Sequence, residues 1–91
     1  MANLKQEHKR VISCSDYDYF EIVCLFHYPV TINLRSGEQR SGMALDLCRD
    51  THKNECLKLS VGDQASLVQL TQITKLTINT ANPHFSEKLF S

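Results

Sequence analysis

The sequence predicts a mainly β (α+β) protein, in which one N-terminal helix is followed by a five-stranded antiparallel barrel. Three observations lead to this fold class. Apolar residues recur with helical spacing over 16–27, Pro29 ends that pattern, and apolar and polar residues then alternate in five short runs up to residue 78. At 91 residues, with 42% hydrophobic and 22% charged residues, the chain has room for one globular domain.

The chain divides into three parts. Residues 1–12 are polar and show no sustained period, so we expect a mobile N-terminal tail. Residues 13–79 hold the helix and the five strands and form the predicted barrel domain. Residues 80–91 are mostly polar around Pro83, and we expect a C-terminal tail or a short helix there.

The helix is predicted over residues 16–27. Ser15 has the residue type of an N-cap, and Asp16 and Asp18 fall in the first turn, where the helix dipole favours negative charge. Pro29 prevents the helix from continuing. The apolar positions that follow the cap form one stripe at i, i+3, i+4 and i+7, made of Tyr19, Ile22, Val23 and Phe26.

Five strands are predicted from alternating apolar and polar residues, at 30–35, 43–48, 56–61, 66–70 and 73–78. Gly37 and Gly62 mark tight turns, and Thr71-Gln72 makes a sharp corner between the last two strands. A hairpin centred on His52 keeps the apolar residues of both of its strands on one face. This register pairs Leu47 with Leu57, Leu45 with Leu59 and Met43 with Val61.

One helix followed by five short antiparallel strands, with almost no connection between the last two, is the layout of the Sm-like and SH3-like barrels. Closing the sheet removes exposed strand edges, and the apolar stripe of the helix can cover one open end of the barrel. The OB-fold fits less well, because its helix lies within the series of strands.

Three of the four cysteines have spacings to histidine that resemble zinc ligands, in Cys24-x2-His27 and Cys48-x3-His52-x3-Cys56. No C-x2-C knuckle accompanies them, and Cys24 lies on the predicted helix, where a free cysteine usually packs as a small hydrophobe. Cys48 and Cys56 are cross-strand neighbours in the predicted hairpin, so a disulfide between them is geometrically feasible. We expect free thiols all the same, because the chain shows no export signal, and we expect neither a metal nor any other cofactor.

Sequence patterns of enzymes are absent: there is no G-x-S-x-G elbow, no phosphate-binding glycine loop and no H-E-x-x-H helix. Cys24 and His27 could in principle serve as nucleophile and base, but a pair at i and i+3 beside an apolar stripe is far more typical of packing. We therefore expect a protein that is not an enzyme. The chain also shows no secretory signal and no apolar run long enough to span a membrane, so we expect a cytoplasmic protein.

The net charge is zero, but the charges are unevenly placed. The stretch SCSDYDYFE at 13–21 holds three acids and three aromatic residues and no base. Proteins that bind single-stranded RNA combine a basic groove with stacking aromatic rings, whereas the predicted strands carry almost no aromatic residues and mix both signs of charge. An Sm-like module that binds single-stranded RNA directly is therefore the alternative hypothesis, and it is weaker than a protein-binding role.

The acidic cluster has two interpretations. Asp16 and Asp18 suit the first turn of a helix, where each acid contributes about 0.3–1 kcal/mol. Capping accounts less well for Glu21, and it does not require Tyr17, which the apolar stripe leaves near the exposed side. Carboxylates beside an exposed ring suit a partner whose basic groove stacks nucleic-acid bases. The residues by themselves leave a solvated cap and a contact surface equally favoured.

The most distinctive motif of the sequence is Cys14-x-Asp16-Tyr17-Asp18. Together with Glu21, Cys24, His27 and the strand TINLRSGE at 31–38, it resembles the Rho-binding antiterminator (Rof) family. The similarity runs from about Ile12 to Ile78, and the segment at 72–76 resembles the last strand of the family. The two cysteines and the histidine of segment 48–56 depart from the family pattern.

The resemblance implies an Sm-like barrel with a leading helix that inhibits Rho-dependent transcription termination. The implied partner is the termination factor Rho, bound at its RNA-binding N-terminal OB-type domain in competition with RNA. The carboxylates then stand in for phosphates and a tyrosine ring for a base. No direct binding to nucleic acid or membranes is expected, and the free protein is expected to be a monomer. The implied partner-binding residues are Asp16, Tyr17, Asp18 and Glu21 on the helix, with Lys53 and Asn54 in the hairpin turn.

Overall fold

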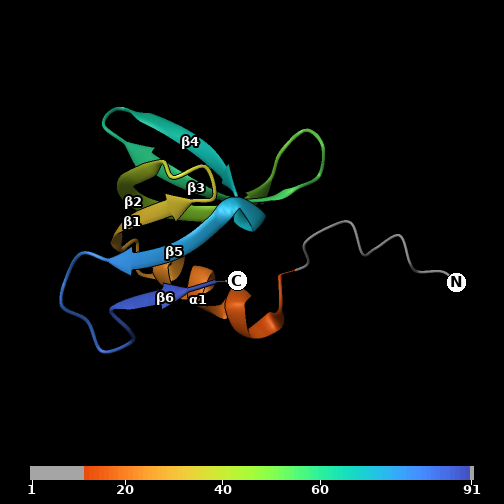
Figure 1. Ribbon diagram of the computed structural model, residues 1–91. Helices are drawn as coiled ribbons and strands as arrows, with labels where there is room; N and C mark the ends of the chain where they lie inside the picture. Colours follow the sequence, from red (N-terminus) through yellow and green to blue (C-terminus); the bar gives the residue numbers. More distant parts are fainter. Residues whose placement is uncertain (1–11, 91) are drawn as a thin grey trace, which may run out of the picture.

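The computed structural model describes residues 12–90, and Figure 1 shows one helix followed by six strands. The predicted mainly β (α+β) class is confirmed, and all five predicted strands are present. The predicted N-terminal tail lies outside the described residues, apart from Ile12. The elements are α1 (Cys14–Leu25), β1 (Pro29–Leu34), β2 (Gln39–Arg49), β3 (Glu55–Val61), β4 (Gln64–Gln69), the 3-10 turn η2 (Leu70–Gln72), β5 (Ile73–Ile78) and β6 (Glu87–Leu89).

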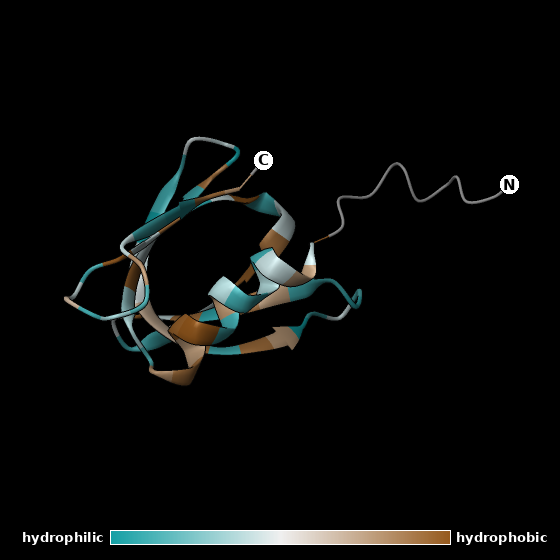
Figure 2. Ribbon diagram, turned by 90° about the horizontal axis from the view of Figure 1, so that it is seen from below, coloured by the Kyte–Doolittle hydropathy of each residue, from teal (hydrophilic) through white to brown (hydrophobic). Residues whose placement is uncertain are grey.

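All strands join one antiparallel sheet in the order β4-β3-β2-β1-β5-β6. The turn η2 links β4 directly to β5, where the sequence predicted a corner at Thr71-Gln72. The sheet therefore curls round on itself, as Figure 2 shows, and α1 lies across it. Buried apolar side chains from α1 and from β1 to β5 fill the interior. The helix of the described chain is too short to cross a membrane.

Helix α1 begins two residues earlier than predicted, and its N-cap is Ser13 rather than Ser15. Ser13 has the extended backbone of a cap, and its Oγ accepts a hydrogen bond from the Asp16 N–H at 3.1 Å. Both serines have the residue type of a cap, so composition did not distinguish them. The helix ends at Leu25 instead of residue 27, because His27 adopts the left-handed region with a φ of 51°.

The buried face of α1 differs from the predicted stripe. Phe20, Val23 and Cys24 are buried, whereas Phe26 is 49% exposed. The stripe was therefore right for Val23 and wrong for Phe26. Apolar residues occur on several sides of this helix, so the helical period did not fix which side is buried. Packing decided it, because Phe20 stacks on Phe90 near the C-terminus, with 4.9 Å between the ring centroids.

The β2–β3 hairpin has the predicted register near its turn and a different register further along. A bulge at Leu45 separates the two parts, and it leaves Ala44 buried and Met43 exposed. An alternating pattern does not reveal one extra residue, which is why the prediction failed there. The confirmed pairs are Leu47–Leu57 and Cys48–Cys56, and the wrong ones are Leu45–Leu59 and Met43–Val61, which the structure replaces with Ala44–Leu59 and Met43–Ser60.

Strand β2 starts at Gln39 rather than at residue 43, and it pairs with β1 on one side and with β3 on the other. Gly42 lies opposite Val30 in this longer strand. A Cβ at Gly42 would overlap the carbonyl oxygen of Ser60 on β3. Glycine is therefore required at this point, where two backbones approach each other closely.

The C-terminal segment, expected as a tail or a short helix, contains strand β6, which pairs with β5. The segment returns to the sheet because its aromatic residues pack on the rest of the molecule. Phe85 meets the Tyr19 ring edge-on at 4.9 Å, and Phe90 stacks on Phe20. The sheet therefore continues through β6, beyond residue 79, where the predicted barrel domain ends.

Candidate functional site

The acidic residues of α1 fall into two groups. Asp18 and Glu21 are exposed, and neither forms an ion pair with another residue of the described range 12–90. Asp16 is partly buried, and its Oδ1 lies 3.9 Å from the Nζ of Lys88 on β6. A surface pair at this distance contributes at most about 1 kcal/mol. Within the described residues, the helix therefore presents two carboxylates without an ion-pair partner and a third that is partly neutralised.

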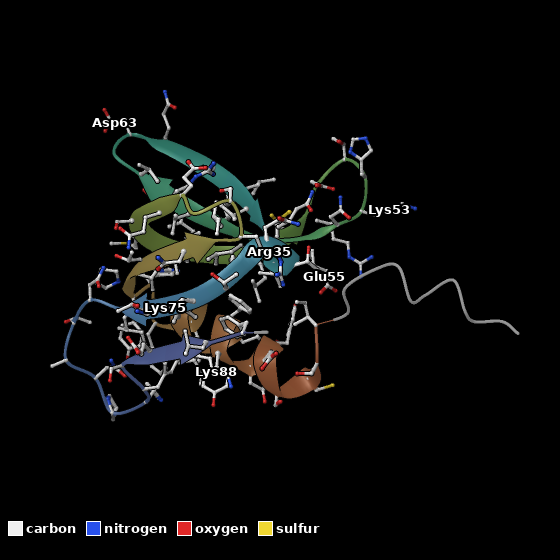
Figure 3. All side chains as sticks on the ribbon, in the orientation of Figure 1. Arg35, Lys53, Glu55, Asp63, Lys75 and Lys88 are labelled. Carbon is white, nitrogen blue, oxygen red and sulfur yellow. The ribbon has the colours of Figure 1, made fainter. Side chains whose placement is uncertain are left out.

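Lys88 also lies over an aromatic ring of the helix. Its Nζ is 5.0 Å from the centre of the Tyr19 ring, within the range of a cation–π interaction. Figure 3 shows Lys88 on β6, which runs beside α1. Tyr19 also contacts Phe85, so it belongs to the contact between the helix and the C-terminal segment.

Tyr17 was expected near the exposed side of the helix, but it is partly buried and packs against the core. Burial raises the pKa of its hydroxyl, and the negative charges of Glu55 and Glu21 raise it further, while Arg49 acts in the opposite direction. The hydroxyl therefore stays protonated at neutral pH and can donate a hydrogen bond. These neighbours place the start of α1 near the turn end of the β2–β3 hairpin, where Arg49 and Glu55 form an ion pair at 3.6 Å.

An open groove of about 990 Å³ runs between α1 and β2. Three carboxylates line it, from Asp18 and Glu21 on the helix and from Asp46 on β2, and no lysine or arginine of the described chain does. Sequence reasoning missed Asp46, because its charge is one of several of mixed sign and the bulge that precedes it leaves no mark in the apolar pattern. The other lining residues are Tyr17, Ile22, Cys24, Leu25, His27, Leu45 and Leu47.

The two residues expected to bind the partner from the β2–β3 turn have different surroundings. Asn54 is partly buried, and its backbone N–H and its side-chain amide donate hydrogen bonds to the Asp50 carboxylate at 2.9 and 3.2 Å. Lys53 is exposed, and Figure 3 labels it on the loop between β2 and β3. Neither residue lines the groove, although Tyr17 of the helix lies near Glu55, which follows Asn54 in the chain.

Asp50 organises this turn. Its carboxylate also accepts a hydrogen bond from the His52 N–H at 2.8 Å, and its carbonyl accepts one from the Lys53 N–H at 2.9 Å. The hydrogen bond from the Asn54 N–H is the main reason why the pKa of Asp50 is lowered. The turn is therefore held by an ionised carboxylate whose acceptor positions are used within the loop.

The cysteines are free, and two of them have perturbed thiols. Burial raises the pKa of Cys24 to about 12, with smaller contributions from Asp46 and Cys48. Burial also raises the pKa of Cys56. Such thiols stay protonated at neutral pH and are poor nucleophiles. Within residues 12–90, no three histidine, cysteine or acidic residues are grouped so that they could hold a metal ion.

The fold and the groove define a small α+β protein with a groove that three carboxylates line. The chain belongs to the family described as "Modulator of Rho-dependent transcription termination (ROF)", whose family model matches residues 11–90. The resemblance seen in the sequence is therefore confirmed. The family is one of transcription-termination modulators and is not a family of enzymes.

Relatives with known names support the same family. The chain is 33% identical to "Protein rof" of Escherichia coli (strain K12) and to "Protein rof" of Shigella flexneri, over 67 residues that make up 72% of this chain and 77% of each relative. A solved structure, "YaeO bound to Magnesium from Vibrio cholerae O395", is similar with a TM-score of 0.80 and 37% identity. That similarity covers 82% of this chain and 97% of the other.

Proposed function

We propose that this protein inhibits Rho-dependent transcription termination by binding Rho at its RNA-binding N-terminal OB-type domain, in competition with RNA. The acidic face of α1 makes the contact. The observation that carries this mechanism is that two exposed carboxylates, Asp18 and Glu21, have no ion-pair partner within residues 12–90 and lie on a groove that no lysine or arginine of that range lines. A domain that captures RNA carries positive charge, so complementary charges steer the two proteins together.

Each helix residue has a distinct role in this mechanism. Asp18 and Glu21 take the place of RNA phosphates and pair with lysine or arginine side chains of Rho. Asp16 joins them when a cation of Rho replaces Lys88 at its carboxylate. Tyr17 offers the accessible part of its ring and a hydroxyl donor, because the rest of its side chain packs on the core.

The β2–β3 turn contributes a secondary contact. Lys53 is exposed and reaches the partner directly. Asn54 acts by holding the shape of the turn, since both its backbone N–H and its side-chain amide are bonded to Asp50.

The proposed state of the protein follows from the same features. It acts as a cytoplasmic monomer that needs no cofactor, catalyses no reaction and binds neither nucleic acid nor membranes. The acidic groove supports the absence of nucleic-acid binding, because phosphates would be repelled from the carboxylates of Asp18, Glu21 and Asp46. The protonated, poorly nucleophilic thiol of Cys24 supports the absence of thiol catalysis at the groove.

The test is charge reversal at single sites. Asp18→Lys and Glu21→Lys each change the net charge by two, and each should weaken binding to Rho by at least about tenfold and relieve the inhibition of termination. Asp63→Lys makes the same charge change at the β3–β4 turn, where Figure 3 shows Asp63 on the loop, and should bind as the unsubstituted protein does. Binding is measured by pull-down with purified Rho, with and without competing RNA, and termination by transcription in vitro.

Two outcomes would overturn the proposed function. The first is normal Rho binding by the helix variants at unchanged thermal stability. The second is tight, salt-sensitive binding of a pyrimidine-rich single strand by this protein without Rho in an electrophoretic shift assay, which would instead establish the alternative of a direct RNA-binding module.

A further inference from the structure

The exposed side of α1 changes character along its length. Asp18, Glu21, Ile22 and Leu25 are spaced at i, i+3, i+4 and i+7, so they form one stripe that faces the groove. The acids occupy the first part of the stripe, and Leu25, which is 74% exposed, occupies its end. Together with Ile22, Leu25 gives the helix wall of the groove an apolar end.

The opposite wall of the groove comes from the bulged part of β2. Leu45 and Leu47 supply apolar surface, and Asp46 lies between them. The Asp46 carboxylate is fixed, because its Oδ1 accepts a hydrogen bond from the Leu47 N–H at 2.8 Å. Its charge also acts on the Cys24 thiol across the groove, which places the carboxylate near the helix. Lys58 is the cross-strand neighbour of Asp46, but the two form no ion pair within the described residues.

The groove thus has an apolar lining with carboxylates on both walls. A long basic side chain has the matching chemistry, since its methylene stem packs on apolar surface while its charged head pairs with carboxylates. The charge complementarity selects this occupant over an apolar helix, which would leave three acids desolvated and unpaired. The chain itself provides no lysine or arginine that lines the groove within residues 12–90.

We infer that the groove between α1 and β2 receives an arginine or lysine side chain of the partner, with Asp46 as a ligand of its charged head and Leu25 as a cover for its stem. The inference rests on the proposed function, because it takes Rho as the partner that supplies this side chain. It extends the contact surface from the helix to β2 and adds two residues that neither the helix motif nor the hairpin turn contains.

The experiment measures the affinity of the full chain for Rho with matched substitutions. Asp46→Asn removes the charge and keeps the oxygen that accepts the Leu47 N–H, and it should weaken binding by about tenfold. Asp63→Asn is the control with the same change of charge and should leave the affinity unchanged. Leu25→Ser should weaken binding by about threefold, against no change for Leu67→Ser at an exposed leucine on β4.

The outcomes separate this inference from the proposed function. Loss of binding in Asp18→Lys together with normal binding in Asp46→Asn would show that Rho uses the helix without the groove, and would overturn the inference alone. Normal binding in both would overturn the proposed function itself. A weaker salt dependence of the Asp46→Asn affinity, beside an unchanged one for Asp63→Asn, is the further expected result, because one ion pair is lost. Thermal unfolding of each variant checks that the fold is intact.

Discussion

The first half of α1 and the β2–β3 turn both carry charged residues at the surface, yet they use them in opposite ways. On the helix, Asp18 and Glu21 are exposed at the groove and form no ion pair within the described chain. In the turn, the Asp50 carboxylate accepts hydrogen bonds from the backbone of His52 and from Asn54. The helix carboxylates therefore remain available to a partner, whereas the Asp50 carboxylate is already hydrogen-bonded within the turn.

This difference shows how to weigh residues that a sequence pattern assigns to one interface. A polar residue whose hydrogen-bonding groups are already satisfied acts on a partner through the shape that it maintains. A residue with an unpaired charge at the surface acts directly. By this standard we propose Glu21 and Asp18 as contacts with Rho, Asn54 as a positioning residue, and Lys53 as a contact carried on a fixed loop.

The comparison is tested most strongly by removing the side chains of each region. Asp18→Ala combined with Glu21→Ala should weaken binding to Rho by about a hundredfold, because two ion pairs are lost. Lys53→Gly should weaken it only about threefold. Lys53 has a φ of 67°, a conformation that glycine adopts without strain, so this substitution removes the amine and keeps the turn. Affinities measured by calorimetry that are equal for the two variants would contradict the distinction.

A smaller effect is expected from Lys88, whose amine lies beside the Asp16 carboxylate of the helix. Lys88→Gln frees Asp16 and should tighten binding to Rho by about threefold, since Rho no longer has to displace an internal cation. Lys75→Gln is the matched control, because Lys75 pairs with Glu87 at 3.4 Å away from the helix acids. Weaker binding by Lys88→Gln would show that the lysine supports the site instead of competing for it.

Acid should loosen the turn only after the carboxylates with ordinary pKa values have begun to titrate. The pKa of Asp50 is lowered from its ordinary value of 3.8 by the Asn54 and His52 hydrogen bonds. A lowered pKa stabilises the folded state above the ordinary value, and this contribution is lost as the pH falls through the folded pKa. The amide signals of His52 and Asn54 in NMR spectra should therefore keep their positions while carboxylates of ordinary pKa titrate, and should move only at lower pH. Movement of those signals together with the carboxylates of ordinary pKa would contradict this.

The smallest expected effect concerns the buried side of the helix. Iodoacetamide at neutral pH should modify the exposed Cys14 and leave Cys24 nearly unmodified, because Cys24 is buried and its pKa is raised to about 12. Mass spectrometry of peptides from the native protein measures both rates. Comparable labelling of the two cysteines would show that the helix opens away from the sheet.

The sequence was sufficient for the elements whose local patterns are strong. The alternation of apolar residues, the corner at Thr71-Gln72 and the hairpin register next to the turn were all predicted correctly. Strand β6 was missed because its three residues carry no alternating pattern, and it forms only where β5 offers an unpaired edge. The bulge at Leu45 was missed because an alternating pattern gives residue types only. It does not show that one strand has an extra residue opposite its partner.

The candidate site was predictable to a similar extent. Asp18 and Glu21 are exposed because their spacing places them opposite the buried Phe20 and Val23, which a helical pattern can express. Tyr17 proved partly buried, since its position depends on how the helix is rotated on the sheet. Asp46 reaches the groove through packing of α1 on β2, which is a contact between distant parts of the chain and has no local signature.

Strand β6 has a consequence for how these molecules can associate. A head-to-tail ring of curved sheets requires each subunit to offer two open edges, one for each neighbour. Here β4 forms one edge of the sheet. The other edge is formed by β6, a strand of three residues that include Glu87 and Lys88, which pairs with the outer side of β5. Short, charged edge strands discourage further pairing. The C-terminal segment thus covers the edge of β5 with which a neighbouring subunit would otherwise pair.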